Sequence, residues 1–146
     1  MSHRSGRLLL LAGLVAVLAT GCSGGKRSVT ASATTASCAS AAGLGGTVSD
    51  HGSAAAGGSS LAITAGDFFF APTCESKVPT GTVSLTVRNS GQTLHNVSVA
   101  GQGVDQDVPP GKTITVRLRV GDRPLVYVCK YHRTAGMVGA LLPARG

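Results

Sequence analysis

Near the C-terminus, three side chains that bind soft metal ions lie close together: Cys129, His132 and Met137. Their C-x2-H-x4-M spacing allows a single loop to direct a thiolate, an imidazole and a thioether at the same point. A second imidazole, His95, lies upstream in the segment Leu94-His95-Asn96. Two imidazoles and a thiolate with a weak axial thioether are the ligands of mononuclear copper sites that exchange one electron. The sequence therefore predicts a copper site at these four residues.

Two other interpretations of these residues stay open. A zinc site usually takes four nitrogen, sulfur or carboxylate ligands and has little use for a thioether. Cys129 and His132 could instead form a nucleophile and its base, but the sequence indicates no third orienting group, and Met137 would have no role. The four histidines leave none for a second, substrate-binding copper, because His3 belongs to the leader and His51 to the expected linker. We therefore expect no enzymatic activity.

The elements that must position these ligands are expected to be strands. From residue 61 onward, short apolar runs are bounded by Gly, Pro, Asn and Asp, and residues 83–87 and 114–120 alternate apolar and polar side chains. Further strands are expected at residues 61–64, 68–71, 96–100, 125–129 and 137–142. The chain has 21 glycines and only 3% aromatic residues, which favours turns and short segments over long helices. About seven strands indicate an all-β, two-sheet sandwich.

The N-terminus is typical of an exported protein. Arg4 and Arg7 precede an apolar run over residues 8–19, which is too short to span a membrane but fits a secretory signal. The following Thr20-Gly21-Cys22 resembles a bacterial lipobox, so we predict a signal peptide over residues 1–21 and lipidation of Cys22. This places the protein on the extracytoplasmic face of the cell membrane, held by acyl chains such as palmitate. The alternative is an ordinary secretory signal in which Cys22 is incidental.

Residues 22–60 are dominated by Ser, Ala, Gly and Thr, a composition typical of a flexible linker, so the folded domain is expected over residues 61–146. Four cysteines occur in the chain. With Cys22 assigned to the anchor and Cys129 to the metal, Cys38 and Cys74 remain for a disulfide in an oxidising compartment. The alternative is that both are free thiols.

At residues 61–142 the sequence resembles the cupredoxins, close to the plastocyanin, amicyanin and pseudoazurin group. The features that carry the resemblance are the Cys129–Met137 spacing, Asn89 with the segment Gly91-x3-His95-Asn96, and a Pro-Gly-Lys-Thr turn before a strand. The resemblance implies a Greek-key β-sandwich of seven to eight strands and one type 1 copper ion. It implies that Cys129, His95 and His132 are equatorial ligands and Met137 the axial one. It also implies that Asn96 ties the two ligand loops together, and that electrons leave at the edge of His132.

The expected function is the transfer of single electrons between redox partners; copper buffering or delivery is the main alternative, and a scaffold sandwich that retains the ligands is a third. Lys130 and Arg133 flank His132, so we expect an acidic docking surface on the redox partner. From residue 61 onward basic residues outnumber acidic ones, but no basic run with interleaved aromatics indicates binding to nucleic acid. We expect a monomer.

Overall fold

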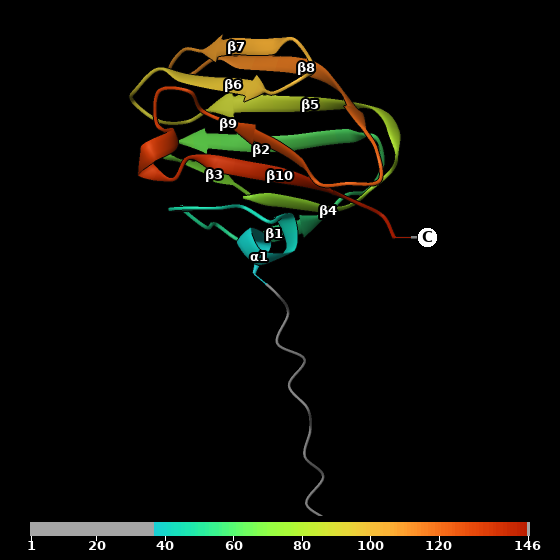
Figure 1. Cartoon of the computed structure of the whole chain (residues 1–146). Helices are drawn as coiled ribbons and strands as arrows, with labels where there is room; N and C mark the ends of the chain where they lie inside the picture. Colours follow the sequence, from blue (N-terminus) through green and yellow to red (C-terminus); the bar gives the residue numbers. More distant parts are fainter. Residues whose placement is uncertain (1–36, 146) are drawn as a thin grey trace, which may run out of the picture. The chain divides into compact units, whose positions relative to one another are not determined.

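The computed structural model describes residues 37–145, which form a sandwich of two mixed sheets (Figure 1). The elements are α1 (Cys38–Ala42), β1 (Ser53–Ala55), β2 (Ser60–Gly66), β3 (Phe69–Ala71), β4 (Cys74–Val78), β5 (Gly81–Asn89), β6 (His95–Val99), β7 (Val104–Val108), β8 (Thr113–Val120), β9 (Leu125–Val128), the 3-10 helix η1 (Arg133–Ala135) and β10 (Val138–Pro143). The larger sheet has the order β1-β4-β10-β9-β6-β7, and the smaller has the order β3-β2-β5-β8. The predicted all-β cupredoxin-like sandwich is confirmed.

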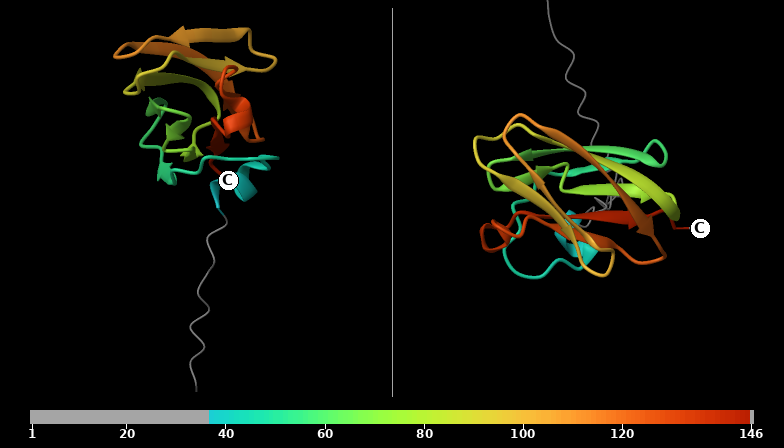
Figure 2. Two further views of the ribbon diagram at one scale, coloured as in Figure 1. Left: turned by 90° about the vertical axis from the view of Figure 1, so that its left-hand side faces the viewer. Right: turned by 90° about the horizontal axis from the view of Figure 1, so that it is seen from above.

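Alternation of side chains produces the apolar layer between the two sheets. In the antiparallel pair β5–β8, Val83 lies opposite Leu118 and Leu85 lies opposite Val116, and all four side chains are buried. The intervening residues point away from the core, where the hydroxyls of Thr86 and Thr115 lie 3.1 Å apart. Seen from above, β2 and β5 lie in one layer and β10 in the other (Figure 2). The core therefore occupies the space between the sheets.

Residues 37–145 contain ten strands, more than the seven to eight expected, because three strands lack a clear apolar pattern. β4 has the sequence Cys-Glu-Ser-Lys-Val, and β7 has Val-Asp-Gln-Asp-Val. β1 is Ser-Ala-Ala and is exposed at every position, yet it pairs in parallel with β4. Such strands are held by backbone hydrogen bonds to a neighbour, which the alternation of side chains cannot reveal.

Part of the expected linker over residues 22–60 belongs to the fold, because α1, β1 and the first residue of β2 lie within residues 37–60. The predicted disulfide between Cys38 and Cys74 is confirmed, with the two Cα atoms 5.6 Å apart. It fastens α1 to β4, and both half-cystines pack with Ala42 and Ala140 in a small buried cluster. Covalent attachment and this cluster order a segment whose composition alone indicated flexibility.

The signal peptide over residues 1–21, the lipidated Cys22 and the first part of the linker lie outside the described residues. Within residues 37–145, no helix is both long and apolar enough to cross a membrane.

Candidate metal centre

The segment from Cys129 to Met137 is a compact loop closed by its own backbone. It begins directly after β9 and ends directly before β10, and His132 forms the N-cap of η1. The amide of Cys129 donates to the carbonyl of Met137 (3.0 Å), the amide of His132 to the carbonyl of Cys129 (3.1 Å), and the amide of Met137 to the carbonyl of His132 (3.2 Å). The three sulfur- or imidazole-bearing residues of the loop are therefore fixed relative to one another without any ligand.

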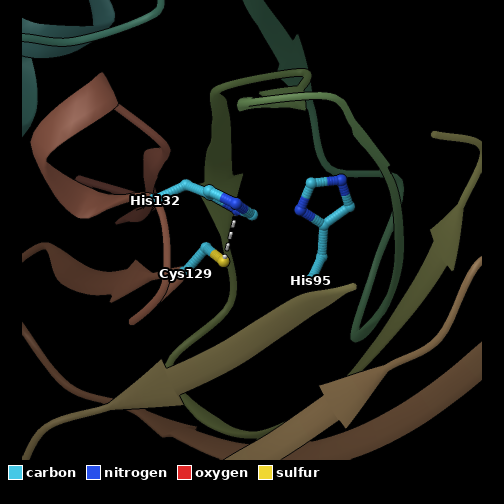
Figure 3. A group of neighbouring side chains, drawn as sticks. All are labelled: His95, Cys129 and His132. Carbon is cyan, nitrogen blue, oxygen red and sulfur yellow. Dashed lines mark hydrogen bonds between the residues drawn. The ribbon is translucent and has the colours of Figure 1, made fainter. Parts of the chain in front are cut away.

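His95 is brought to this loop by the sheet rather than by sequence proximity. It is the first residue of β6, and β6 pairs with β9, the strand that leads into the loop. The start of β6, the loop and the β2–β3 turn all lie at the same end of the sandwich (Figure 1). The potential ligand atoms of His95, Cys129 and His132 lie within 4.8 Å of one another, and their side chains point toward a common centre (Figure 3). The Sγ atom of Cys129 is 3.4 Å from Nδ1 of His132.

The donor atoms of this cluster fit a metal ion. His95 and Cys129 are completely buried, and Cys129 is the one free cysteine among residues 37–145. The Nδ1 atom of His95 is buried and has no hydrogen-bond partner, although a buried polar atom without a partner is costly. Burial lowers the pKa of His95, and the positive charge that His132 can carry lowers it further. This imidazole is therefore neutral near pH 7, with a lone pair available to a metal.

The structure bears differently on the roles predicted for Met137 and Asn96. Met137 is completely buried and closes the loop through its backbone, which leaves its predicted axial ligation as a prediction. The side chain of Asn96 forms no hydrogen bond to the Cys129–Met137 loop. Its Nδ2 donates to Asp105 (2.7 Å) and Asp107 (2.9 Å) on β7. These two carboxylates in turn bind residues of the loop, so Asn96 connects β6 to the ligand loop only through β7.

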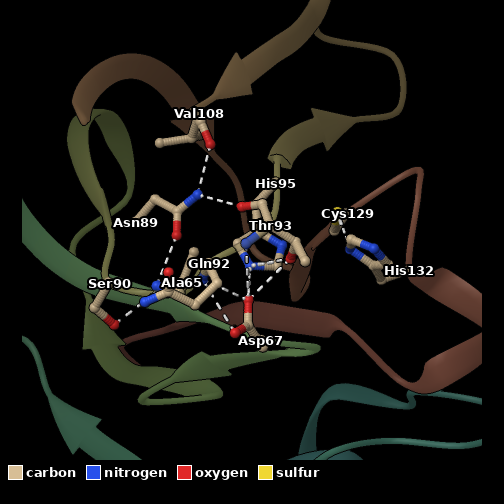
Figure 4. Close-up of polar contacts among 11 residues, drawn as sticks. Ala65, Asp67, Asn89, Ser90, Gln92, Thr93, His95, Val108, Cys129 and His132 are labelled. Atoms are coloured by element: carbon tan, nitrogen blue, oxygen red, sulfur yellow. Dashed lines mark hydrogen bonds and ion pairs between the residues drawn. The ribbon is translucent and has the colours of Figure 1, made fainter. Parts of the chain in front are cut away.

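A carboxylate that the sequence did not indicate lies behind His95. Asp67, in the turn between β2 and β3, accepts hydrogen bonds from the backbone of Gln92 and Thr93 and from the hydroxyl of Thr93, and its Oδ1 is 3.4 Å from Nε2 of His95 (Figure 4). The hydrogen bond from the Gln92 amide lowers the pKa of Asp67 most, and the hydrogen bond from the Thr93 hydroxyl lowers it further. The side chain of Asn89 braces the same loop by donating to the carbonyls of Thr93 and Val108 (both 2.8 Å).

The surface around His132 is partly apolar. His132 is half-buried, and the ring of Phe68 meets it edge to face at 4.8 Å between centroids. Phe68, Tyr131 and Leu94 belong to the few large apolar side chains that are exposed among residues 37–145. The predicted docking residue Lys130 is engaged already, since its Nζ lies 2.8 Å from Asp105. Arg133 is exposed and forms no ion pair within residues 37–145.

Comparison with known proteins gives a match in structure but not in sequence. No protein-family model matches the chain, and no curated protein is significantly similar in sequence. Among solved structures, a reduced auracyanin from Roseiflexus castenholzii matches with a TM-score of 0.51 and 18% identity, covering 60% of this chain and 98% of the auracyanin. Auracyanin B matches with a TM-score of 0.51 and 18% identity, covering 68% of this chain and 97% of the other.

Proposed function

Because the chain has the cupredoxin fold, we propose that it carries single electrons through one copper ion of type 1 bound by His95, Cys129 and His132, with Met137 as the axial ligand. The observation that carries this proposal is the convergence of two imidazoles and a buried thiol within 4.8 Å. When bound, copper would supply a centre that alternates between two oxidation states one electron apart. The protein would need no substrate chemistry of its own.

The residues contribute in different ways. Cys129 supplies a buried thiolate, and the two imidazoles supply neutral nitrogen donors, a mixture that suits both oxidation states of copper. Backbone hydrogen bonds between Cys129, His132 and Met137 hold the loop, so its donors need not rearrange when the charge changes. A rigid donor set favours fast electron exchange because little nuclear motion accompanies each transfer.

His132 is the proposed point of electron exit, because it is the most exposed of the three donors and lies beside the exposed rings of Phe68 and Tyr131. We extend the proposal to a redox partner with an acidic docking surface, which would approach Arg133 and the net positive charge of the chain. Such docking predicts that rates fall as ionic strength rises. Rates that do not change between low and high salt would contradict it.

We also propose that Cys22 is lipidated and holds the protein on the extracytoplasmic face of the cell membrane, with the domain monomeric. Support comes from the apolar run before the Thr20-Gly21-Cys22 sequence and from the Cys38–Cys74 disulfide, which is typical of an oxidising compartment. Metabolic labelling with a fatty acid tests this. The label should appear in the wild-type protein and disappear in Cys22→Ser; a label that persists would show that another residue is acylated.

The copper proposal is tested by spectroscopy of the purified protein loaded with copper(II). We expect an intense visible thiolate-to-copper band, a paramagnetic-resonance spectrum of a type 1 site, and reversible reduction by one electron. Cys129→Ser should abolish the visible band. His51→Ala is the matched control, because it removes an exposed histidine outside the donor cluster. A colourless copper(II) complex, or a band that survives in Cys129→Ser, would refute the proposal. Copper that leaves readily to an acceptor while reduction is sluggish would instead support copper delivery.

A further inference from the structure

We infer that Asp67 is a positioning residue for His95 and lowers the reduction potential of the copper centre. This inference rests on the proposed copper site, but its geometry is present in the chain without a metal. The Oδ1 atom of Asp67 is 3.4 Å from Nε2 of His95, on the opposite side of the ring from the unpartnered Nδ1 atom. The imidazole therefore has one nitrogen directed at the donor cluster and the other directed at a carboxylate (Figure 4).

The carboxylate is held in place by groups other than His95. The amide of Gln92 donates to both its oxygens (3.0 and 3.1 Å), and the amide and hydroxyl of Thr93 donate to Oδ1 (3.2 and 2.9 Å). Gly91 leaves the space that the carboxylate fills, because a Cβ at this position would overlap Oδ1 of Asp67. Asp67, in the β2–β3 turn, is thus held firmly against the loop before His95, even though its side chain is 36% exposed.

The negative charge of Asp67 would affect the copper ion through His95. With Nδ1 as the metal donor, Nε2 must carry the ring proton, and this N–H faces the Asp67 carboxylate and the Thr93 hydroxyl, each 3.4 Å away. A carboxylate behind a ligating histidine fixes the tautomer and raises the basicity of the donor nitrogen. A more basic donor stabilises the more highly charged oxidised ion more than the reduced ion. Asp67 should therefore favour copper(II) and lower the potential.

The test is Asp67→Asn, which removes the negative charge and keeps the shape of the side chain. The amide oxygen can still accept the hydrogen bonds from the loop. Removal of an outer partner of this kind costs about 10- to 100-fold in metal affinity, and we expect this loss for copper(II) and a smaller loss for copper(I). For a one-electron couple, each tenfold difference between the two losses raises the potential by about 59 mV. Asp122→Asn is the matched control, since it removes the same charge from an exposed residue outside the donor cluster.

A second measurement does not require copper. The tautomer of His95 in the metal-free protein can be determined from its ring nitrogen chemical shifts by NMR. We expect the Nε2–H tautomer in the wild type and in Asp122→Asn, and an increased share of Nδ1–H in Asp67→Asn. A wild-type protein with the Nδ1–H tautomer would overturn the inference even if copper binds.

The outcomes separate this inference from the proposed function. If the wild type shows a type 1 spectrum but Asp67→Asn has the potential of Asp122→Asn, the role of Asp67 is refuted and the copper site stands. Equal losses of copper(I) and copper(II) affinity would show a purely structural role and also overturn it. If the wild type shows no type 1 spectrum, the proposed function fails, and the tautomer measurement still decides whether Asp67 positions His95.

Discussion

Loss of the Cys38–Cys74 disulfide should lower the free energy of unfolding by about 4 kcal/mol. The two cysteines are 36 residues apart, and the chain-entropy relation gives this value for a loop of that length. The bridge is the covalent connection between α1 and β4, and the segment that follows α1 reaches the ligand loop, where the amide of Ser49 donates to the carbonyl of Gly136 (2.9 Å). We therefore expect α1 and this segment to loosen first.

The assay is denaturant unfolding of the metal-free protein at equilibrium. A Cys129→Ser background prevents the buried free thiol from exchanging with the disulfide. In this background, the double variant Cys38→Ala/Cys74→Ala is compared with the parent, with and without reductant. The parent should lose stability on reduction and approach the double variant, whereas the double variant should not respond to reductant. A loss below about 1 kcal/mol would refute the chain-entropy argument and show that residues 37–52 are held by packing alone.

Three further substitutions test packing and ionisation. Gly139→Ala should destabilise the protein by about 1–3 kcal/mol in denaturant unfolding, because the added Cβ overlaps the buried ring of Tyr127 on the paired strand. Gly136→Ala should destabilise by a similar amount, about 1–3 kcal/mol, because φ is +91° and a Cβ would lie 2.8 Å from the amide of Ser49. Burial raises the pKa of Glu75 above its ordinary value of 4.5, so ionisation opposes folding at neutral pH. Glu75→Gln should therefore raise stability near pH 7, and unfolding at stepwise lower pH should show this gain disappearing as pH falls below 4.5; a gain that persists there would contradict the assignment.

Local patterns in the sequence were sufficient to predict those strands and loops whose residues are close together in the chain. Alternation in β5 and β8 reflects burial on one face, and the spacing from Cys129 to Met137 reflects one short loop. Each of these features is decided within about ten residues, a span over which periodicity is informative. The convergence of His95 with that loop was predicted from the ligand chemistry of copper sites and was also implied by the family resemblance. The pairing of β6 with β9 explains it physically.

Asp67 could not be found in this way, because only tertiary pairing brings it to His95. The parallel pairing of β2 with β5 sets Ala65 beside Asn89, and the amide of Ser90 donates to the carbonyl of Ala65 (2.9 Å). The turn that follows β2 then lies against the loop that precedes β6. A lone aspartate after a glycine is typical of an ordinary turn, so its contact with His95 becomes visible only in the structure.

Tertiary pairing also decides the charge beside His132. The sequence alone indicates Lys130 as a docking residue, but in the structure Lys130 lies beside Asp105 and Asp107, and the three together carry one negative charge. This cluster should therefore weaken, at this one place, the attraction of an acidic partner to Arg133 and to the net positive charge of the chain. With an anionic one-electron reagent such as hexacyanoferrate, Asp107→Asn should raise the exchange rate at low salt. Because hexacyanoferrate carries three or four negative charges, removing a unit charge about 10 Å away in water should change the rate by roughly tenfold at low salt, and added salt should remove the effect. Asp122→Asn is the control and should have less effect, because Asp122 precedes β9 and the ligand loop follows the opposite end of this strand. A rate that is unchanged or lower in Asp107→Asn would show that the cluster does not face the incoming reagent.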